Sequence, residues 1–164
     1  MFPVSCLQHR AVVRAALVIV VTGCSVEASP GQDEPAAARK EVINAPGTPP
    51  GLPFSSAVRV GDLLFLSGVI GAPPGTTAVV PGGVGPETRQ TLENIRDVLE
   101  HAGSSMADVV KCTVFLQDID EYAQMNEVYA TFFPGDPPAR STVAGSGLAF
   151  DARVEIECFA LSGG

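Results

Sequence analysis

Residues 153–161 read RVEIECFAL, and their side chains alternate in character along the chain. Successive side chains of an extended segment point to opposite sides, so this stretch would separate its residues into two faces. One face would carry Val154, Ile156, Cys158 and Ala160, and the other Glu155, Glu157, Phe159 and Leu161. A period of two over this length predicts a β-strand with one face in the core.

Further strands are predicted on both sides of this stretch. Residues 56–60 and 63–67 flank Gly61-Asp62, which is typical of a two-residue hairpin turn. Residues 108–116 read DVVKCTVFL, and β-branched and aromatic side chains of this kind favour a central strand. A short strand is expected at residues 140–143.

Two amphipathic helices are predicted between the strands. Residues 86–102 carry Pro86 and Glu87 in the first turn and are followed by Gly103, all favourable positions at helix ends. Residues 120–133 would begin with Asp120 as the N-cap and end at Pro134. The apolar positions at helical spacing are Leu92, Ile95, Leu99 and Ala102 in the first helix, and Tyr122, Met125, Val128, Tyr129 and Phe132 in the second.

The resulting order of strands with inserted helices predicts an α+β domain, a mixed sheet with both helices on one face. The 164 residues are 46% hydrophobic and 17% charged, which excludes a disordered chain. We expect one folded domain at residues 41–164, because its length fits a single core.

The N-terminus carries the features of an export signal. Arg10 and Arg14 precede an apolar run at residues 15–21, too short to span a bilayer. The run leads into VTGC at residues 21–24, which resembles the lipobox of bacterial lipoproteins. We therefore expect a signal peptide at residues 1–23, a lipidated Cys24 and a flexible tether at residues 24–40. The alternative is an ordinary signal peptide with a coincidental cysteine.

This interpretation predicts an exported lipoprotein, anchored in the membrane through Cys24 on the periplasmic face or cell surface of a bacterium. The formal net charge of −8 argues against nucleic-acid binding, which needs a basic face. Neither a phosphate-binding loop nor a dinucleotide-binding motif occurs in the sequence. We expect no metal and no cofactor.

The remaining reactive side chains have ordinary structural explanations. We expect His101 to interact with the dipole at the end of a helix rather than to act in catalysis. Cys112 and Cys158 lie in predicted strands, where they would be small buried apolar residues. A disulfide between them is the alternative in an oxidising compartment, because the sequence cannot place the two sulfur atoms.

Arg140 is the best candidate for binding an organic acid. It follows Pro137-Pro138-Ala139 at a rigid junction between a loop and a strand. A guanidinium held there offers two parallel hydrogen bonds to a carboxylate. Glu155 lies fifteen residues later, on the same predicted strand face as Glu157. A surface role remains the alternative for each of these charged residues.

The motif PARSTV at residues 138–143, followed by VEIE at residues 154–157, resembles the YjgF/RidA family of enamine/imine deaminases. Supporting segments occur in order over almost the whole domain. They are PFSSA at 53–57, VGDLLFLSG at 60–68, TRQTLEN at 88–94, VVKCTVFL at 109–116 and MNEVY at 125–129.

The resemblance implies a chorismate-mutase-like α+β fold and a homotrimer with clefts between subunits. It implies hydrolysis of reactive 2-imino or enamine acids to 2-keto acids and ammonia. Arg140 would hold the substrate carboxylate and Glu155 would activate water. The other residues implied to line the cleft are Phe54, Ser67, Gly68, Asn126 and Thr142.

The sequence departs from the family pattern at several site positions. Val69 stands where Gln is usual, and Phe54 stands where many members have Tyr. Both changes make the expected pocket more apolar. The alternative to an enzyme is a non-catalytic trimeric module that binds small carboxylates or a surface partner.

Overall fold

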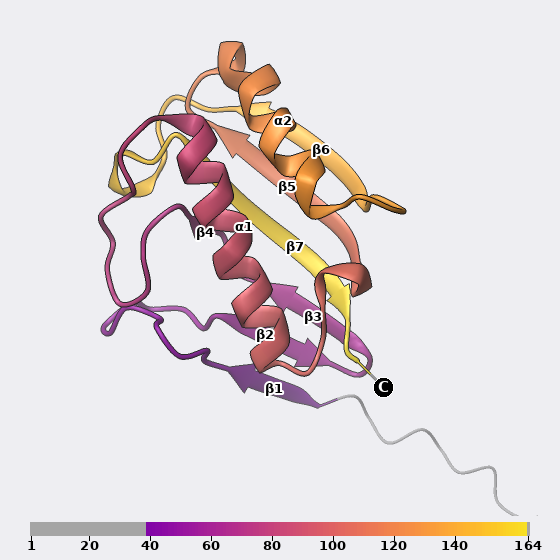
Figure 1. Ribbon diagram of the computed structural model, residues 1–164. Helices are drawn as coiled ribbons and strands as arrows, with labels where there is room; N and C mark the ends of the chain where they lie inside the picture. Colours follow the sequence, from indigo (N-terminus) through magenta and orange to yellow (C-terminus); the bar gives the residue numbers. More distant parts are fainter. Residues whose placement is uncertain (1–38, 164) are drawn as a thin grey trace, which may run out of the picture. The chain divides into compact units, whose positions relative to one another are not determined.

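The computed structural model describes residues 39–163. This part of the chain folds into a single sheet with two α-helices and three short 3₁₀ turns (Figure 1). The elements are β1 (Lys40–Ile43), β2 (Ala57–Val60), β3 (Leu63–Leu66), β4 (Val69–Ile70), α1 (Val84–His101), η1 (Met106–Asp108), β5 (Val109–Leu116), η2 (Ile119–Glu121), α2 (Tyr122–Phe132), β6 (Ala139–Ala144), η3 (Ala149–Asp151) and β7 (Val154–Leu161).

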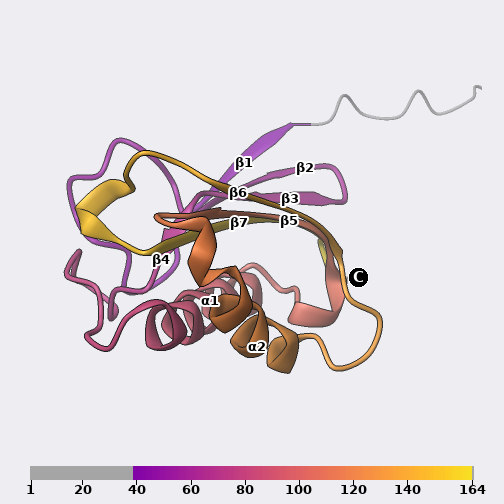
Figure 2. The ribbon, with the colours of Figure 1, turned by 90° about the horizontal axis from the view of Figure 1, so that it is seen from above.

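The sheet has the strand order β1-β2-β3-β7-β5-β6, and β4 also pairs with β7. β5 and β6 run parallel, whereas the other pairs are antiparallel. Figure 2 shows α1 and α2 together on one side of this sheet. The predicted α+β class, a mixed sheet with both helices on one face, is therefore confirmed.

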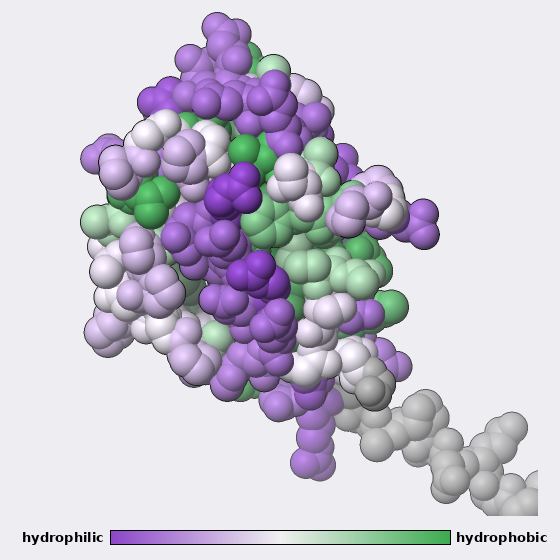
Figure 3. Space-filling model, viewed as in Figure 1, coloured by the Kyte–Doolittle hydropathy of each residue, from purple (hydrophilic) through white to green (hydrophobic). Residues whose placement is uncertain are grey.

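The core lies between the helices and the sheet. Leu92, Ile95 and Leu99 of α1 are completely buried, as are Val114 of β5 and Ile156 of β7. Each such side chain contributes about 1.5–3 kcal/mol by leaving water. The outer side of α1 forms a hydrophilic stripe on the surface (Figure 3), as the amphipathic pattern predicts.

The ends of the helices follow the sequence signals in part. Gly103 has φ 77°, its N–H donates to Glu100 O, and the next N–H donates from Ser104 to Leu99 O. These two bonds make a Schellman motif, so the predicted glycine stop is confirmed. The prediction that Asp120 caps α2 is wrong. The turn η2 precedes α2 and is capped by Asp118, which accepts a hydrogen bond from Asp120 N at 3.0 Å. The N-cap residue of α2 is Glu121, which makes no side-chain capping bond.

Two strands, β1 and β4, lie outside the strand segments recognised in the sequence. Lys40, the last residue of the predicted tether, is the first residue of β1. β4 is only two residues long, so it carries no periodic pattern, yet it pairs Ile70 with Glu155 of β7. This short strand places the segment at residues 67–70 beside a candidate catalytic residue.

Cys112 and Cys158 form a disulfide between the neighbouring strands β5 and β7. Both residues are buried, as expected, with 0% and 1% of their surface exposed. The expectation of unpaired cysteines is wrong, because the antiparallel register places the two residues directly opposite each other.

The predicted signal peptide, lipidated Cys24 and most of the predicted tether lie outside the described residues. Within residues 39–163, neither helix has the length and apolar character needed to cross a membrane.

Candidate functional site

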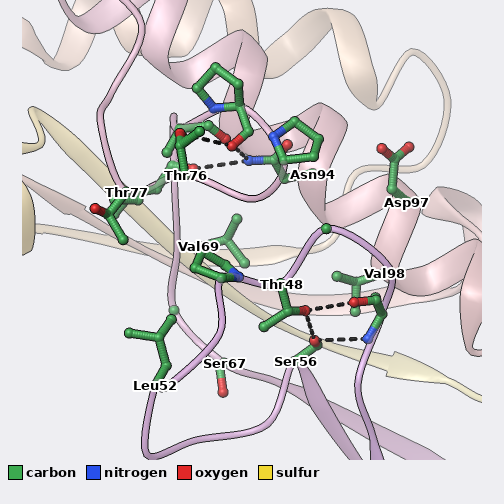
Figure 4. Close-up of a pocket in the computed structure, with 18 of the residues that line it drawn as sticks. Thr48, Leu52, Ser56, Ser67, Val69, Thr76, Thr77, Asn94, Asp97 and Val98 are labelled. Atoms are coloured by element: carbon green, nitrogen blue, oxygen red, sulfur yellow. Dashed lines mark hydrogen bonds between the residues drawn. The ribbon is translucent and has the colours of Figure 1, made fainter.

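Four of the candidate residues line one cavity. Phe54 lies before β2, Ser67 and Gly68 join β3 to β4, and Glu155 lies on β7; all four contribute to a cavity of about 240 Å³. Figure 4 shows Ser67, Val69 and Leu52 on its walls. The hydroxyl of Ser67 donates to Ser55 O at 2.7 Å, so it can serve a ligand only as an acceptor.

Gly68 lies directly against the carboxylate of Glu155. A Cβ atom at position 68 would be 1.9 Å from Glu155 Oε1, so only glycine leaves room for the carboxylate as it stands. Burial raises the pKa of Glu155, and the negative charge of Glu157 on the same face raises it further. A carboxylate with a raised pKa is a stronger base than an exposed one and is suited to accept a proton.

Arg140 is held by side chains of α2. Its Nη2 donates to Asn126 Oδ1 and to the Tyr122 hydroxyl, both at 2.8 Å. The centre of the guanidinium lies 4.5 Å from the ring centroid of Tyr129, within the range of a cation–π interaction. These contacts fix Arg140 in place, and its Nε and Nη1 donate to nothing else among the described residues.

Two buried hydroxyl groups near Arg140 lack hydrogen-bond partners within the described residues. They are Thr142 Oγ1, on the same face of β6, and the hydroxyl of Tyr129. Burial raises the pKa of Tyr129 to about 12, so its hydroxyl stays protonated. An unsatisfied buried polar group costs about 1–3 kcal/mol, and such groups need an explanation when they cluster.

The two groups of candidate residues lie on opposite faces of the sheet. Arg140 pairs with Cys112 of β5, whose side chain faces the helices, whereas Glu155 pairs with Phe115, three residues further along β5. Side chains three residues apart in a strand point to opposite sides. One chain therefore brings Phe54, Ser67, Gly68 and Glu155 together, and separately Asn126, Arg140 and Thr142, but does not join the two groups.

The contacts of Arg140 with Tyr122 and Tyr129 were not anticipated from the sequence. The helical spacing predicts both tyrosines on the core-facing side of α2. Tyr129 is buried, whereas Tyr122 is 40% exposed. Their spacing from Asn126, four and three residues away, places all three on one helix face. That spacing was a usable signal once Arg140 was a candidate.

A second charged cluster fixes the start of β7. Glu87 of α1 is buried, and its Oε2 accepts a hydrogen bond from the backbone N–H of Arg153 at 2.8 Å. The Arg153 side chain in turn donates from Nε to Glu121 Oε1 at 2.6 Å. Burial raises the pKa of Glu87, and the backbone bond from Arg153 lowers it in part. The cluster anchors the chain two residues before Glu155.

No group of three or more His, Cys, Asp or Glu side chains in residues 39–163 is arranged to hold a metal ion.

Comparison with known proteins places the chain in a family. Residues 43–162 match the family model described as Endoribonuclease L-PSP. The chain is 45% identical over 122 residues to a RutC family protein of Pyrococcus horikoshii, covering 74% of this chain and 97% of that protein. It is 38% identical over 125 residues to the mouse 2-iminobutanoate/2-iminopropanoate deaminase, covering 76% of this chain and 93% of that protein.

A solved structure agrees with these matches. The conserved Rid family protein YyfA from Yersinia pestis superimposes with a TM-score of 0.71 at 39% identity, covering 75% of this chain and 99% of that one. The chain belongs to the Endoribonuclease L-PSP (YjgF/RidA) family.

Proposed function

We propose that this protein hydrolyses reactive 2-imino or enamine acids to 2-keto acids and ammonia. The observation that carries the proposal is Glu155, a desolvated carboxylate placed against Gly68 at the wall of a cavity. Arg140 provides the second requirement, a fixed guanidinium that can bind the substrate carboxylate. The deaminase name carried by the mouse relative supports the same reaction.

The proposed reaction needs a base and a positioned substrate. Glu155 accepts a proton from water as the water oxygen bonds to the imine carbon and the C=N π electrons move to nitrogen, and Glu155 then gives this proton to that nitrogen. The tetrahedral adduct then forms the C=O bond and expels ammonia, with Glu155 carrying the hydroxyl proton to the departing nitrogen. Arg140 fixes the substrate carboxylate, which converts an encounter with water into an oriented reaction.

The separation of the two residue groups supports a homotrimer as the active form. On the helix-free face of β7, Glu155 and Glu157 are followed by Phe159 and Leu161, which are 38% and 46% exposed. Leu63 and Phe65 of β3 extend this apolar surface. A second subunit that covers this surface would lie beside Glu155 and could supply its own Arg140 on the edge strand β6.

Substitution of Arg140 tests the proposed role. Purified protein would be given 2-imino acids generated in situ by an amino-acid oxidase, and ammonia release would be compared with the spontaneous rate. Arg140→Ala should lower kcat/KM by at least about 100-fold, because hydrogen bonds to a charged group contribute about 1.5–3 kcal/mol each. Arg96→Ala, which removes an exposed arginine of α1, should leave the rate unchanged. Acceleration by wild type that survives Arg140→Ala would reject the assigned role.

A mixing experiment tests whether the site lies between subunits. Arg140→Ala and Glu155→Gln proteins would be inactive alone, whereas co-refolded mixtures would contain one intact pair in each mixed trimer. An equal mixture should regain about one quarter of wild-type activity. If both variants are inactive alone and the mixture stays inactive, the site does not lie between subunits. If no imine is hydrolysed by wild type but 2-keto acids bind in an Arg140-dependent way, the protein is the binding module instead.

We also propose that the protein is exported and anchored by Cys24. The proposal is supported by the lipobox-like VTGC and by the Cys112–Cys158 disulfide, because disulfides persist mainly in oxidising compartments. Labelling with a radioactive fatty acid should mark the full chain and not Cys24→Ala. Equal labelling of both, or labelling of neither, would contradict lipidation at this residue.

A further inference from the structure

The cavity beside Glu155 is larger than water and a small carboxylate require. Its volume is about 240 Å³, whereas an apolar cavity of about 150 Å³ already accepts benzene. Its lining includes Gly68 and Glu155 as well as Asp97 and Val98 of α1. Figure 4 labels Asp97 and Val98 among the residues around this cavity. The cavity therefore has room for a substrate side chain of aromatic size.

Apolar side chains from separate segments form its walls. Leu52 and Phe54 come from the loop before β2, Val69 from β4 and Phe150 from the turn before β7. The rings of Phe54 and Phe150 are 50% and 51% exposed, so two aromatic side chains remain available for contact. An apolar ligand that covers these rings removes their surface from water, which favours binding.

The backbone at Phe150, which carries one of these rings, has an unusual conformation. Phe150 has φ 58° and Asp151 has φ 55°, two consecutive non-glycine residues in the left-handed region. Conformations of this kind cost about 1–3 kcal/mol each and are concentrated at ligand-binding and catalytic sites. The turn thus presents Phe150 to the cavity at a conformational cost.

Most polar groups on the walls are already satisfied within the protein. The hydroxyl of Thr48 donates to Ala45 O and is 2.6 Å from Ser56 Oγ, which accepts from Ala45 N. The Asn94 amide donates to the backbone oxygens of Ile70 and Ala72. These groups have few hydrogen bonds left to make with a polar ligand side chain, so the interior of the cavity favours an apolar one.

We infer that this cavity is the subsite for the substrate side chain and that it selects 2-imino acids with bulky apolar side chains, such as those derived from leucine and phenylalanine. The inference rests on the proposed deaminase function, because it assigns the substrate class of that same site. Glu155 lies at the reacting end, and the walls formed by Leu52, Phe54, Val69 and Phe150 receive the side chain.

The test compares side chains in the same reaction. The purified full chain would be assayed with imines made from alanine, leucine, phenylalanine and arginine. Each methylene placed in a fitting apolar pocket changes kcat/KM by roughly tenfold or more, so the leucine and phenylalanine imines should exceed the alanine imine by at least about tenfold. The arginine imine tests whether exposed Asp97 makes the cavity select a cation instead.

Two substitutions should remove the preference without removing the reaction. Val69→Gln places an amide on the wall, and Phe150→Ala removes an aromatic ring. Each should reduce kcat/KM for the bulky imines about tenfold more than kcat/KM for the alanine imine. Val110→Gln, the same change at an exposed position of β5, is the matched control. Phe150 is half exposed, so its variant remains informative if Val69→Gln does not fold.

Binding of the product acids separates failure of the inference from failure of the proposed function. Calorimetry would compare pyruvate with 4-methyl-2-oxopentanoate and phenylpyruvate. Acceleration with every imine at similar rates, a preference for the alanine or arginine imine, or equal binding of all three keto acids would overturn the subsite. The absence of any acceleration would reject the deaminase, while tighter binding of the two bulky keto acids, weakened by Phe150→Ala, would still support the subsite.

Discussion

Replacing Gly68 by alanine should disable the site while leaving the fold intact. The added Cβ would lie 1.9 Å from Glu155 Oε1 and 2.9 Å from its Cδ, whereas ordinary contacts begin at 3.4 Å, so the carboxylate must move by about 1.5 Å. A displacement of about 1 Å can cost about 100-fold in rate, so kcat/KM should fall by at least that factor. The clash involves the end of a flexible side chain, so the free energy of unfolding should fall by less than about 1 kcal/mol.

The assay combines imine hydrolysis with urea unfolding of the same preparation. Gly135→Ala is the matched control, because a Cβ there meets nothing within 4 Å. It should retain wild-type activity and stability. A Gly68→Ala protein that unfolds like wild type and also hydrolyses imines at the wild-type rate would show that the position of Glu155 does not matter, and the role assigned to this carboxylate would be wrong.

Three further outcomes are expected. Gly71→Ala places a Cβ 2.6 Å from a backbone oxygen in the first turn of α1, and a backbone atom cannot move aside as a side chain does. Urea unfolding should therefore show a free energy of unfolding lower by about 1–3 kcal/mol, and an unchanged value would contradict this tight packing. Replacing both Cys112 and Cys158 by alanine opens a loop with a sequence separation of 46. The free energy of unfolding should fall by up to about 4 kcal/mol in the same assay, whereas wild-type stability would argue against the disulfide. Burial and Glu157 raise the pKa of Glu155, so activity should fall on the acid side of the pH profile at a pH above the pKa of an ordinary glutamate. Glu157→Gln should shift this acid-side fall to lower pH, and no shift or a shift to higher pH would contradict the coupling.

The long elements of the fold were predictable because their side chains repeat with a clear period. α1 begins two residues before the expected segment, and β7 covers residues 154–161 of the predicted 153–161. β4 could not be predicted, since two residues carry no period. Asp120 is a good capping residue by type, but the turn η2, which Asp118 caps, lies before α2 and leaves Glu121 at the N-cap of that helix.

The sequence proposes a set of candidate site residues but not their arrangement in space. The separation of fifteen positions between Arg140 and Glu155 says nothing about sheet faces, because β5 lies between β6 and β7 in the sheet. The disulfide could not be predicted for the same reason, since the register between two strands cannot be read from the sequence of either strand alone. The contact of Tyr122 with Arg140 depends on the packing of α2 against the end of β6, which is a tertiary property.

The position of β7 determines when the sheet can be completed during synthesis. Among residues 39–163, β7 is the last strand in sequence order, yet it lies between β3 and β5 in the middle of the sheet (Figure 1). A ribosome therefore delivers both outer portions of the sheet before the strand that joins them. The central ladder cannot close before β7 has emerged, and a chain cut before Val154 would lose the strand that joins β3 to β5.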